Sequence, residues 1–330
     1  MDIGTSFLVA ARHGDGNKVS YKEFRDAFFR IKPSSPIASK MIEKGLEHTK
    51  YFKDNLGDFI VTGQDAIVKA VERHMSAARP LSRGVISPTE KDALPVLKFI
   101  LKELIGAPQV ENESLVYSIP AQPIDQPSDQ FDVSYHEDVL GNFLKELGYN
   151  AKSLNEGEAI AYSELMNDGL TGVVCGFGAG MAQIVVMSSG EPVLKTSTVK
   201  SGDFVDRMTA IATNLPDSVI QIEKEAGGYD ITEDNQDNAV HRALVVYYRR
   251  LIDYTVKVLA TQLSNVGQLP KFNQPIPVIL AGGTSLAKGF GTYFKQCLKQ
   301  HQLPFEISTV RLAKDQLYAV ARGCLLASSI

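Results

Sequence analysis

Residues 172–190, GVVCGFGAGMAQIVVMSSG, contain the pattern on which the interpretation of the whole chain depends. Two apolar runs, Val173–Cys175 and Ile184–Met187, flank a turn with glycine at positions 176, 178 and 180. Apolar runs on either side of a glycine-rich turn predict a β-hairpin. Because the tip has no charged or hydroxyl side chain, its backbone N–H groups are open to a ligand, and such groups bind phosphate oxygens.

The composition is that of an ordinary globular protein. The chain has 330 residues, of which 44% are hydrophobic and 22% charged, and this length accommodates two domains. The net charge of −4 gives no basic field for nucleic acid, and the sequence has no membrane-length apolar run and no signal peptide. The cysteines, at 175, 297 and 324, are far apart, so we expect buried thiols and a cytoplasmic location.

Alternating strand and helix patterns predict an α/β fold. Apolar residues recur every three or four positions through 239–263, which predicts a long amphipathic helix, and PIPVIL at 275–280 predicts a buried strand. The sequence Ser-Pro-Thr-Glu at 87–90 predicts the start of a helix that runs to about residue 105. A lysine-rich helical stretch is expected around 38–53.

Two further glycine turns accompany the hairpin: DIGTS at 2–6 and AGGTS at 281–285. Each exposes backbone N–H groups, but one such turn alone is weak evidence, since glycines usually serve the turn itself. Neither the P-loop pattern nor G-x-G-x-x-G in its strand–helix context is present. The order of the three turns along the chain is more specific than any one of them.

Seven motifs in this order resemble those of the actin, heat-shock chaperone and sugar-kinase ATPase superfamily, and within it the bacterial actin MreB and its magnetosome relatives. DIGTS resembles the first phosphate loop, GFGAGMAQIVV the second phosphate hairpin and ILAGGTSLAKGF the adenosine loop. The other four are ARPLSRGVI (78–86), LNEGEAIAY (154–162), VKSGDFVDRM (199–208) and LYAVARG (317–323). The resemblance covers nearly the whole chain.

The resemblance implies an actin-like ATPase fold with two lobes, each a five-stranded mixed sheet flanked by helices, and with Mg²⁺ and ATP or ADP in the cleft between them. The first lobe is expected over residues 1–150, with a small subdomain inserted at about 20–78. The second lobe is expected over residues 151–330, with a small subdomain at about 203–238.

The resemblance also implies roles for individual residues. Asp2 would approach Mg²⁺ through water, and Glu156 would orient the attacking water, so these two are the expected catalytic residues. The residues expected to contact the nucleotide are Gly4, Thr5, Ser6, Gly178, Ala179 and Gly180 at the phosphates, Gly202 and Asp203 at the ribose, and Glu223, Lys224, Gly282, Gly283 and Thr284 at the adenosine.

Plainer interpretations stay open for the charged residues. Asp2 is alternatively a solvated terminal residue, and Lys224 alternatively belongs to a solvated face. Glu156 alternatively does no more than begin a helix, where the helix dipole favours a carboxylate.

The hairpin tip departs from the family. The family has an aspartate at the position of Gly176 and a threonine at that of Met181. That aspartate helps to hold the Mg²⁺ shell and the water, and removal of one preorganised group costs about 10²–10³ in rate. We therefore expect nucleotide binding with slow hydrolysis, and we expect an aspartate restored at position 176 to speed hydrolysis.

Two further departures concern length. Residues 227–238 are all that join Lys224 to the 239–263 helix, where MreB has a β-rich piece, so we expect a reduced small subdomain in the second lobe. The first phosphate loop normally ends a strand, yet Asp2 directly follows Met1. That strand is therefore expected to be missing, or supplied by residues before Met1.

The resemblance leaves two main hypotheses of function. In the first, the chain is an MreB-like cytoskeletal or scaffold protein that binds adenine nucleotide and self-associates into filaments. In the second, it is a non-polymerising, chaperone-like or assembly-platform switch with an unknown protein partner. A sugar-kinase-like phosphotransferase would need an acidic base facing a substrate cleft, and we identify none. The sequence indicates neither nucleic-acid nor membrane binding.

Overall fold

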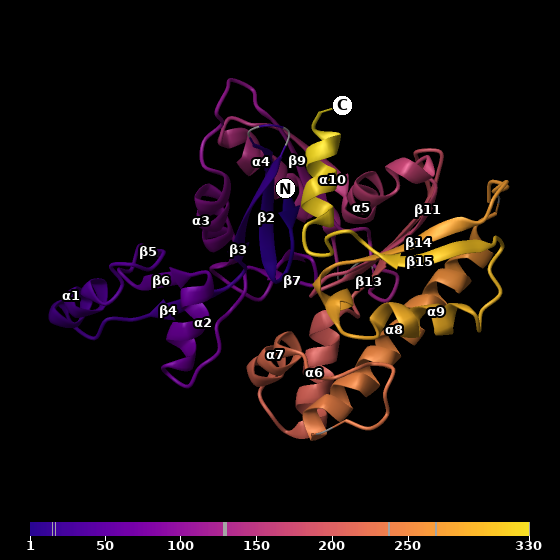
Figure 1. Cartoon of the computed structure of the whole chain (residues 1–330). Helices are drawn as coiled ribbons and strands as arrows, with labels where there is room; N and C mark the ends of the chain where they lie inside the picture. The colour runs from indigo at the N-terminus through magenta and orange to yellow at the C-terminus, as the bar shows by residue number, and fades with distance from the viewer. Residues whose placement is uncertain (15, 17, 128–130, 237, 268, 330) are drawn as a thin grey trace.

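Strands and helices alternate along the chain in the computed structural model, which describes residues 1–14, 16, 18–127, 131–236, 238–267 and 269–329 (Figure 1). The strands are β1 (Asp2–Ile3), β2 (Phe7–His13), β3 (Val19–Arg25), β4 (Phe28–Ile31), β5 (Tyr51–Lys53), β6 (Phe59–Thr62), β7 (Leu81–Ser82), β8 (Val85–Ile86), β9 (Ser114–Ile119), β10 (Asn150–Asn155), β11 (Gly172–Phe177), β12 (Ala182–Ser188), β13 (Glu191–Thr198), β14 (Ile276–Ala281) and β15 (Ile307–Leu312). The helices are α1 (Pro36–Lys44), α2 (Gln64–Val71), α3 (Ala93–Ile105), α4 (Val133–Glu146), α5 (Glu156–Glu164), α6 (Gly202–Thr213), α7 (Asp217–Ala226), α8 (Ala239–Asn265), α9 (Phe290–Leu298) and α10 (Ala319–Ala327), with short 3₁₀ turns at Met166–Asp168 and Gly283–Leu286.

The predicted hairpin lies at the centre of a sheet with the order β13-β12-β11-β14-β15. β12 is antiparallel to β11 and β13, whereas β11, β14 and β15 run parallel. Residues 173–175 of β11 pair with 184–186 of β12, so both arms of the hairpin are as predicted. Both arms are buried because helices cover the two faces of the sheet.

A second sheet repeats this arrangement. β1, β2 and β3 are antiparallel and β9 and β10 are parallel. Met1 joins the two groups: its amine donates to Val116 O at 2.6 Å, and its carbonyl accepts from Ser118 N–H at 2.9 Å. The order β3-β2-β1-β9-β10 therefore matches that of the first sheet described. The strand that we expected to be missing is present in short form as β1, and β10 carries this sheet beyond residue 150, where the sequence placed the lobe boundary.

Helices α5 and α10 form a layer shared by the two sheets (Figure 1). Ile160 of α5 and Ala319 of α10 pack against the β11–β12–β14 face, whereas Ala159 of α5 and Cys324 of α10 pack against β9. The two helices touch backbone to backbone, because a Cβ added at Gly323 would lie 1.7 Å from Ala159 O. This pair of helices thus connects the two lobes.

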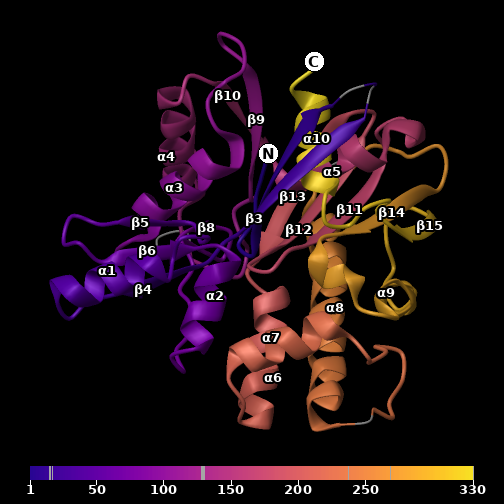
Figure 2. The ribbon, with the colours of Figure 1, turned by 60° about the vertical axis from the view of Figure 1, so that its left-hand side comes forward.

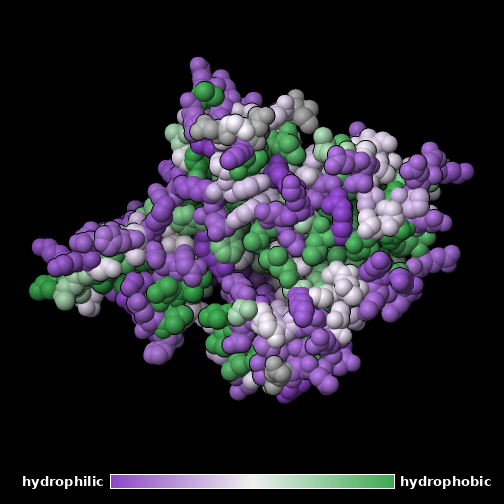
Figure 3. All heavy atoms as spheres, in the orientation of Figure 1, coloured by the Kyte–Doolittle hydropathy of each residue, from purple (hydrophilic) through white to green (hydrophobic). Residues whose placement is uncertain are grey.

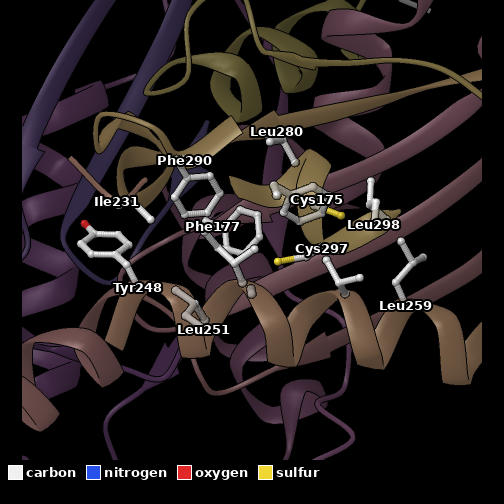
Figure 4. Close-up of a cluster of buried hydrophobic side chains, with 14 of the residues drawn as sticks. Cys175, Phe177, Ile231, Tyr248, Leu251, Leu259, Leu280, Phe290, Cys297 and Leu298 are labelled. Carbon is white, nitrogen blue, oxygen red and sulfur yellow. The ribbon is translucent and has the colours of Figure 1, made fainter. Parts of the chain in front are cut away.

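Further helices cover the outer faces, α3 and α4 on the β1–β9 sheet and α8 and α9 on the β11–β14 sheet. Figure 4 shows Phe177 of β11 and Leu280 of β14 in the second of these cores, above α8. Phe177 meets Phe290 edge-on, with 4.9 Å between ring centroids. α8 is the predicted long helix, and the Asn238 side chain caps it by accepting from His241 N–H. All three cysteines are buried free thiols, as predicted.

Residues 27–78 form a small subdomain, the sheet β4-β6-β5 with α1 and α2, which projects from the first lobe. The expectation of a helix through 38–53 is wrong, because α1 ends at Lys44 and Tyr51–Lys53 pairs with β6 as strand β5. The expected helix start at 87–90 is also wrong: α3 begins at Ala93. The Asp92 carboxylate does not cap this helix, because it accepts from Arg30 of β4 at 2.7 Å.

The corresponding part of the second lobe consists of α6, α7 and the loop after α7, beside the lower half of α8 (Figure 2). The described residues of 202–236 contain no strand. The surface is indented between the part that carries α2 and the part that carries α6 and α7, with apolar side chains on both rims (Figure 3). No helix of the described residues is long and apolar enough to cross a membrane.

Candidate functional site

The three glycine turns meet in one cleft of about 850 Å³, which residues of both lobes line. This volume is in the range of small-molecule sites. The expected site residues that line it are Asp2, Gly4, Thr5, Ser6, Glu156, Gly178, Ala179, Gly180, Asp203, Lys224, Gly282, Gly283 and Thr284. Gly202 lies directly behind the lining, bonded to Gly178. Glu223 does not line the cleft; its carboxylate is 3.8 Å from His241 Nε2, and Glu225 lines the cleft instead.

A single carbonyl holds two of the turns and the start of α6 together. Gly178 O accepts from Ser201 Oγ at 2.6 Å, from Gly202 N–H at 3.1 Å and from Thr284 Oγ1 at 2.8 Å. The Gly178 N–H closes the hairpin turn by donating to Met181 O at 3.0 Å. The hairpin tip, the α6 N-terminus and the 281–285 loop therefore form one unit.

The first phosphate loop lies against the hairpin tip, and this contact explains why the tip is stripped of side chains. Thr5 Oγ1 accepts from Gly84 N–H at 2.9 Å. A Cβ added at Gly180 would lie 2.5 Å from Thr5 Oγ1 and 2.8 Å from Gly84 N. A Cβ added at Gly84 would lie 2.6 Å from Met181 Sδ. No side chain fits between the two loops.

Four backbone N–H groups are available to a ligand at this junction. Gly4 N–H donates to Phe7 O at 3.1 Å and so closes its own turn, as Gly178 N–H does in the hairpin. Within the described part of the chain, no hydrogen bond is formed by the N–H groups of Thr5, Ser6, Ala179 and Gly180. The residues that carry these free donors come from both lobes and line the same cleft, as expected of an anion site.

Asp2 and Glu156 place two half-buried carboxyl groups in the cleft beside these donors. Burial raises the pKa of Asp2 to about 6, and the N-terminal ammonium and the Ser118 hydroxyl, at 3.2 Å, oppose this rise. Burial, and then the charge of Asp2, raise the pKa of Glu156 to about 8. Asp2 is therefore not a solvated terminal residue. Glu156 does begin α5, with Asn155 as the cap, and it also lines the cleft.

The cleft as a whole is acidic. Its described lining has carboxyl side chains at eight positions and lysine at two. No group of three or more His, Cys, Asp or Glu side chains among the described residues could hold a metal ion by itself. Two carboxyl groups fit Mg²⁺, which binds through one or two carboxylates and takes its remaining ligands from water and substrate phosphates.

Gln183 is a site residue that the sequence analysis missed. It lies on β12 opposite Gly176, buried, and its Oε1 accepts from Ala121 N–H at 3.0 Å. Its Nε2 lies near Glu156 and lowers the pKa of that carboxyl without forming a hydrogen bond of standard geometry. The signal that could have revealed it is a lone amide inside the apolar run AQIVVM.

The space beside Gly176, where the family has an aspartate, is filled by an apolar side chain. A Cβ added at Gly176 would lie 2.7 Å from Cδ1 of Ile160, which is buried and lines the cleft. An aspartate at position 176 therefore requires the Cδ1 methyl of Ile160 to shift. The expectation that this substitution speeds hydrolysis stays a prediction, and it depends on whether Ile160 moves aside.

At the other end of the cleft, Lys224 Nζ forms an ion pair with Asp206 Oδ2 at 2.7 Å. The Lys224 side chain is 12% exposed, so it does not belong to a solvated face. Burial raises the pKa of Asp206 to about 6 although Lys224 opposes the rise. Tyr229 and Tyr248 line the cleft next to this pair.

The raised pKa of Glu156 predicts how the free energy of unfolding changes with pH. The unfolded chain releases this proton near pH 4.5, whereas the folded protein holds it to about pH 8, so the free energy of unfolding falls as the pH rises through this interval. In metal-free buffer, Glu156→Gln should gain stability relative to wild type as the pH rises, measured by urea denaturation. Glu111→Gln, at an exposed position, is the control. A Glu156→Gln difference that does not change with pH would contradict the assignment.

The comparisons with known proteins agree with this architecture. A family model described as Volactin matches residues 1–328. The MamK double helical filament structure is 17% identical, with 100% of this chain and 97% of that chain covered and a TM-score of 0.72. MreB5 of Spiroplasma citri bound to ADP is 15% identical, with 97% and 95% covered and a TM-score of 0.62. EutJ, an ethanolamine utilization protein from Carboxydothermus hydrogenoformans, is 15% identical, with 98% and 87% covered and a TM-score of 0.54.

No curated protein matches the chain. The solved structures confirm the predicted actin-like ATPase fold, in which β1–β2 and β11–β12 are equivalent hairpins of two related lobes. With a family model that spans residues 1–328, the chain belongs to the Volactin family.

Proposed function

We propose that this protein is an actin-like cytoskeletal or scaffold protein that binds Mg-ATP or Mg-ADP between its lobes and hydrolyses ATP slowly. We take the first lobe to extend through β10 to about residue 155, with the small subdomain at 27–78, and the second lobe to follow it, with its small subdomain at about 203–238. We propose a cytoplasmic location. One observation carries the proposal: free backbone donors from both lobes and the half-buried carboxyl groups of Asp2 and Glu156 meet in a single cleft.

The phosphates would be bound from both sides. Thr5 and Ser6 in the first lobe, and Ala179 and Gly180 in the second, would donate their N–H groups to phosphate oxygens. Gly4 and Gly178, which have no side chain, would let the backbone come close to the phosphates. Mg²⁺ near Asp2 would neutralise phosphate charge, and Glu156 would orient the attacking water.

The acidity of the cleft makes the metal necessary. A free nucleoside triphosphate would bring its own negative charge among eight carboxyl positions, and like charges disfavour each other strongly in a buried site. We therefore expect binding to require Mg²⁺. The adenosine would lie against Gly202, Asp203, Lys224 and the loop of Gly282, Gly283 and Thr284. Glu225, which lines the cleft on the same helix as Lys224, would take the place expected for Glu223.

The similar structures support both the nucleotide and the filament. MreB5 of Spiroplasma citri was crystallised with ADP and with AMPPNP, and a non-polymerising MamK mutant with AMPPNP. MamK itself is described as a filament. These structures are 15–19% identical to this chain and share its fold, and on that basis we propose adenine binding and self-association for it.

The second candidate is a non-polymerising switch that acts through an unknown protein partner. Two observations favour it: the described part of 202–236 contains no strand, and an ethanolamine utilization protein is among the similar structures. The loss of β structure at this place would remove surface that a filament needs for contacts along its axis.

Gly180→Val should abolish binding of Mg-ATP, because the Cβ alone would lie 2.5 Å from Thr5 Oγ1 and would force the two phosphate loops apart. Isothermal titration calorimetry with ATP and ADP, with and without Mg²⁺, measures this. Gly267→Val is the matched control, since a Cβ added at Gly267 meets no atom within 4 Å. Normal ATP affinity in folded Gly180→Val would show that the hairpin does not bind the phosphates. No binding by wild type up to millimolar ATP would contradict the nucleotide site as a whole.

Hydrolysis should respond to a paired change at positions 160 and 176. Gly176→Asp alone should destabilise the protein by about 1–3 kcal/mol through overpacking against Ile160. Combined with Ile160→Ala, it should raise phosphate release by up to about 10². Ile160→Ala alone, which makes room but adds no carboxylate, is the matched control. If the double variant binds Mg-ATP and releases phosphate no faster than this control, position 176 does not face the metal.

Sedimentation separates the two candidate functions. A filament-forming protein should pellet with Mg-ATP and show filaments by negative-stain microscopy, while Gly180→Val should stay in the supernatant because it lacks nucleotide. Mg-ATP that binds by calorimetry without any pelleting or filaments would favour the non-polymerising switch.

A further inference from the structure

Two ion pairs join the first lobe to helices α6 and α7 beside the cleft. Arg79 Nη1 donates to both carboxylate oxygens of Asp203, at 3.0 and 3.1 Å. Arg25 Nη2 lies 3.3 Å from Glu225 Oε1. The two acidic residues line the cleft and belong to α6 and α7, whereas the two arginines belong to the first lobe. The pair of Arg79 and Asp203 is the one in which both carboxylate oxygens are contacted.

Arg79 is attached to the base of the small subdomain of residues 27–78. The preceding residue, Ala78, donates its N–H to Phe28 O at 2.9 Å and accepts from Phe28 N–H at 2.8 Å. Phe28 is the first residue of β4. Any displacement of this subdomain relative to α6 therefore stretches or releases the contact between Arg79 and Asp203.

Asp203, the partner of Arg79, lies on the side of the ion pair that faces the proposed nucleotide cleft. It is the second residue of α6, and its N–H donates to Ala179 O at 2.8 Å, so its backbone is fixed to the hairpin tip. Its side chain is 39% exposed and lines the cleft. The carboxylate can thus accept further hydrogen bonds from a ligand while Arg79 holds it.

Several charges keep the guanidinium in place. Burial by itself would lower the pKa of Arg79, but the charges of Asp203, Asp26 and Asp206 outweigh it and raise that pKa. Asp26 is fully buried; its Oδ2 accepts from Leu81 N–H at 3.1 Å, and within the described chain its Oδ1 has no partner. Arg79 is therefore bonded to a cleft carboxylate of the other lobe and is also attracted by the charge of Asp26 on its own lobe.

We infer that Arg79 is a positioning residue for the ribose end of the cleft: it orients the Asp203 carboxylate to accept the ribose hydroxyls, and so couples the ribose to the position of the small subdomain. The inference rests on the proposed nucleotide binding. A carboxylate that is already oriented loses less freedom when a hydroxyl donates to it. Linkage is reciprocal, so a bound ribose should also strengthen the hold of Arg79 on Asp203.

The test compares Mg-ATP with Mg-2′,3′-dideoxy-ATP, which lacks both ribose hydroxyls, by isothermal titration calorimetry. Wild type should bind ATP at least about tenfold more tightly, the usual size for a hydrogen bond to a charged group. Arg79→Met should bring this ratio close to one, and Arg79→Lys should restore part of it. Arg83→Met, in the same segment but bonded to Gln126, is the matched control and should keep the wild-type ratio.

An unchanged ratio in Arg79→Met, or a ratio of one in wild type, overturns the inference and leaves nucleotide binding intact. No binding of either nucleotide by wild type overturns the proposed function itself. If Arg79→Met does not fold, Arg79→Lys and Asp203→Asn carry the same comparison, and both should lower the ratio.

Hydrogen–deuterium exchange tests the coupling to the small subdomain. Mg-ATP should slow amide exchange in residues 27–78 of wild type and of Arg83→Met, and should slow it less in Arg79→Met at saturating ATP. Mg-2′,3′-dideoxy-ATP should have a smaller effect on wild type. Equal protection in all three proteins would show that Arg79 does not transmit occupancy of the cleft.

Discussion

The Gly178 carbonyl, which accepts hydrogen bonds from Ser201, Gly202 and Thr284, is the interaction on which the site depends. Its donors come from segments up to 106 residues away in sequence, so one oxygen fixes the hairpin tip, the start of α6 and the adenosine loop to one another. These three segments lie so close together that no side chain fits between their backbones. Gly282 shows this best: its φ is +90°, and a Cβ there would lie 2.2 Å from a backbone oxygen of β11. The contacts between the backbones of these segments therefore require glycine. A ligand would occupy the cleft that the segments leave open.

This cradle explains how the protein would hold a nucleotide without turning it over quickly. Binding would draw on backbone N–H groups and on the carboxyl groups of Asp2 and Glu156, all of which lie along the cleft. Fast hydrolysis would need a further charged group on the metal side, and there the structure has Gly176 with the side chain of Ile160 against it. The two residues fit each other, since glycine at 176 leaves the space that isoleucine fills. The pair would favour a nucleotide that is held for longer, which suits a scaffold or a switch.

Much of this could be predicted from the sequence, because the decisive patterns are local. The hairpin, the long helix α8 and the convergence of three glycine turns all follow from short motifs and their order. What could not be predicted depends on distant contacts. Arg30 takes the carboxylate of Asp92 and shifts the start of α3, Met1 completes a sheet through β9, and Ile160 reaches Gly176. The sequence also did not show which polar residues of α7 face the cleft, because several of them lie close together on that helix.

The most direct test of the account is a crystal structure of the protein with Mg-AMPPNP. The account predicts that the phosphates lie between the N–H groups of Thr5 and Ser6 and those of Ala179 and Gly180, with the metal next to Asp2. Nucleotide density outside this cleft, or phosphates that contact one lobe while the N–H groups of the other remain free, would contradict it.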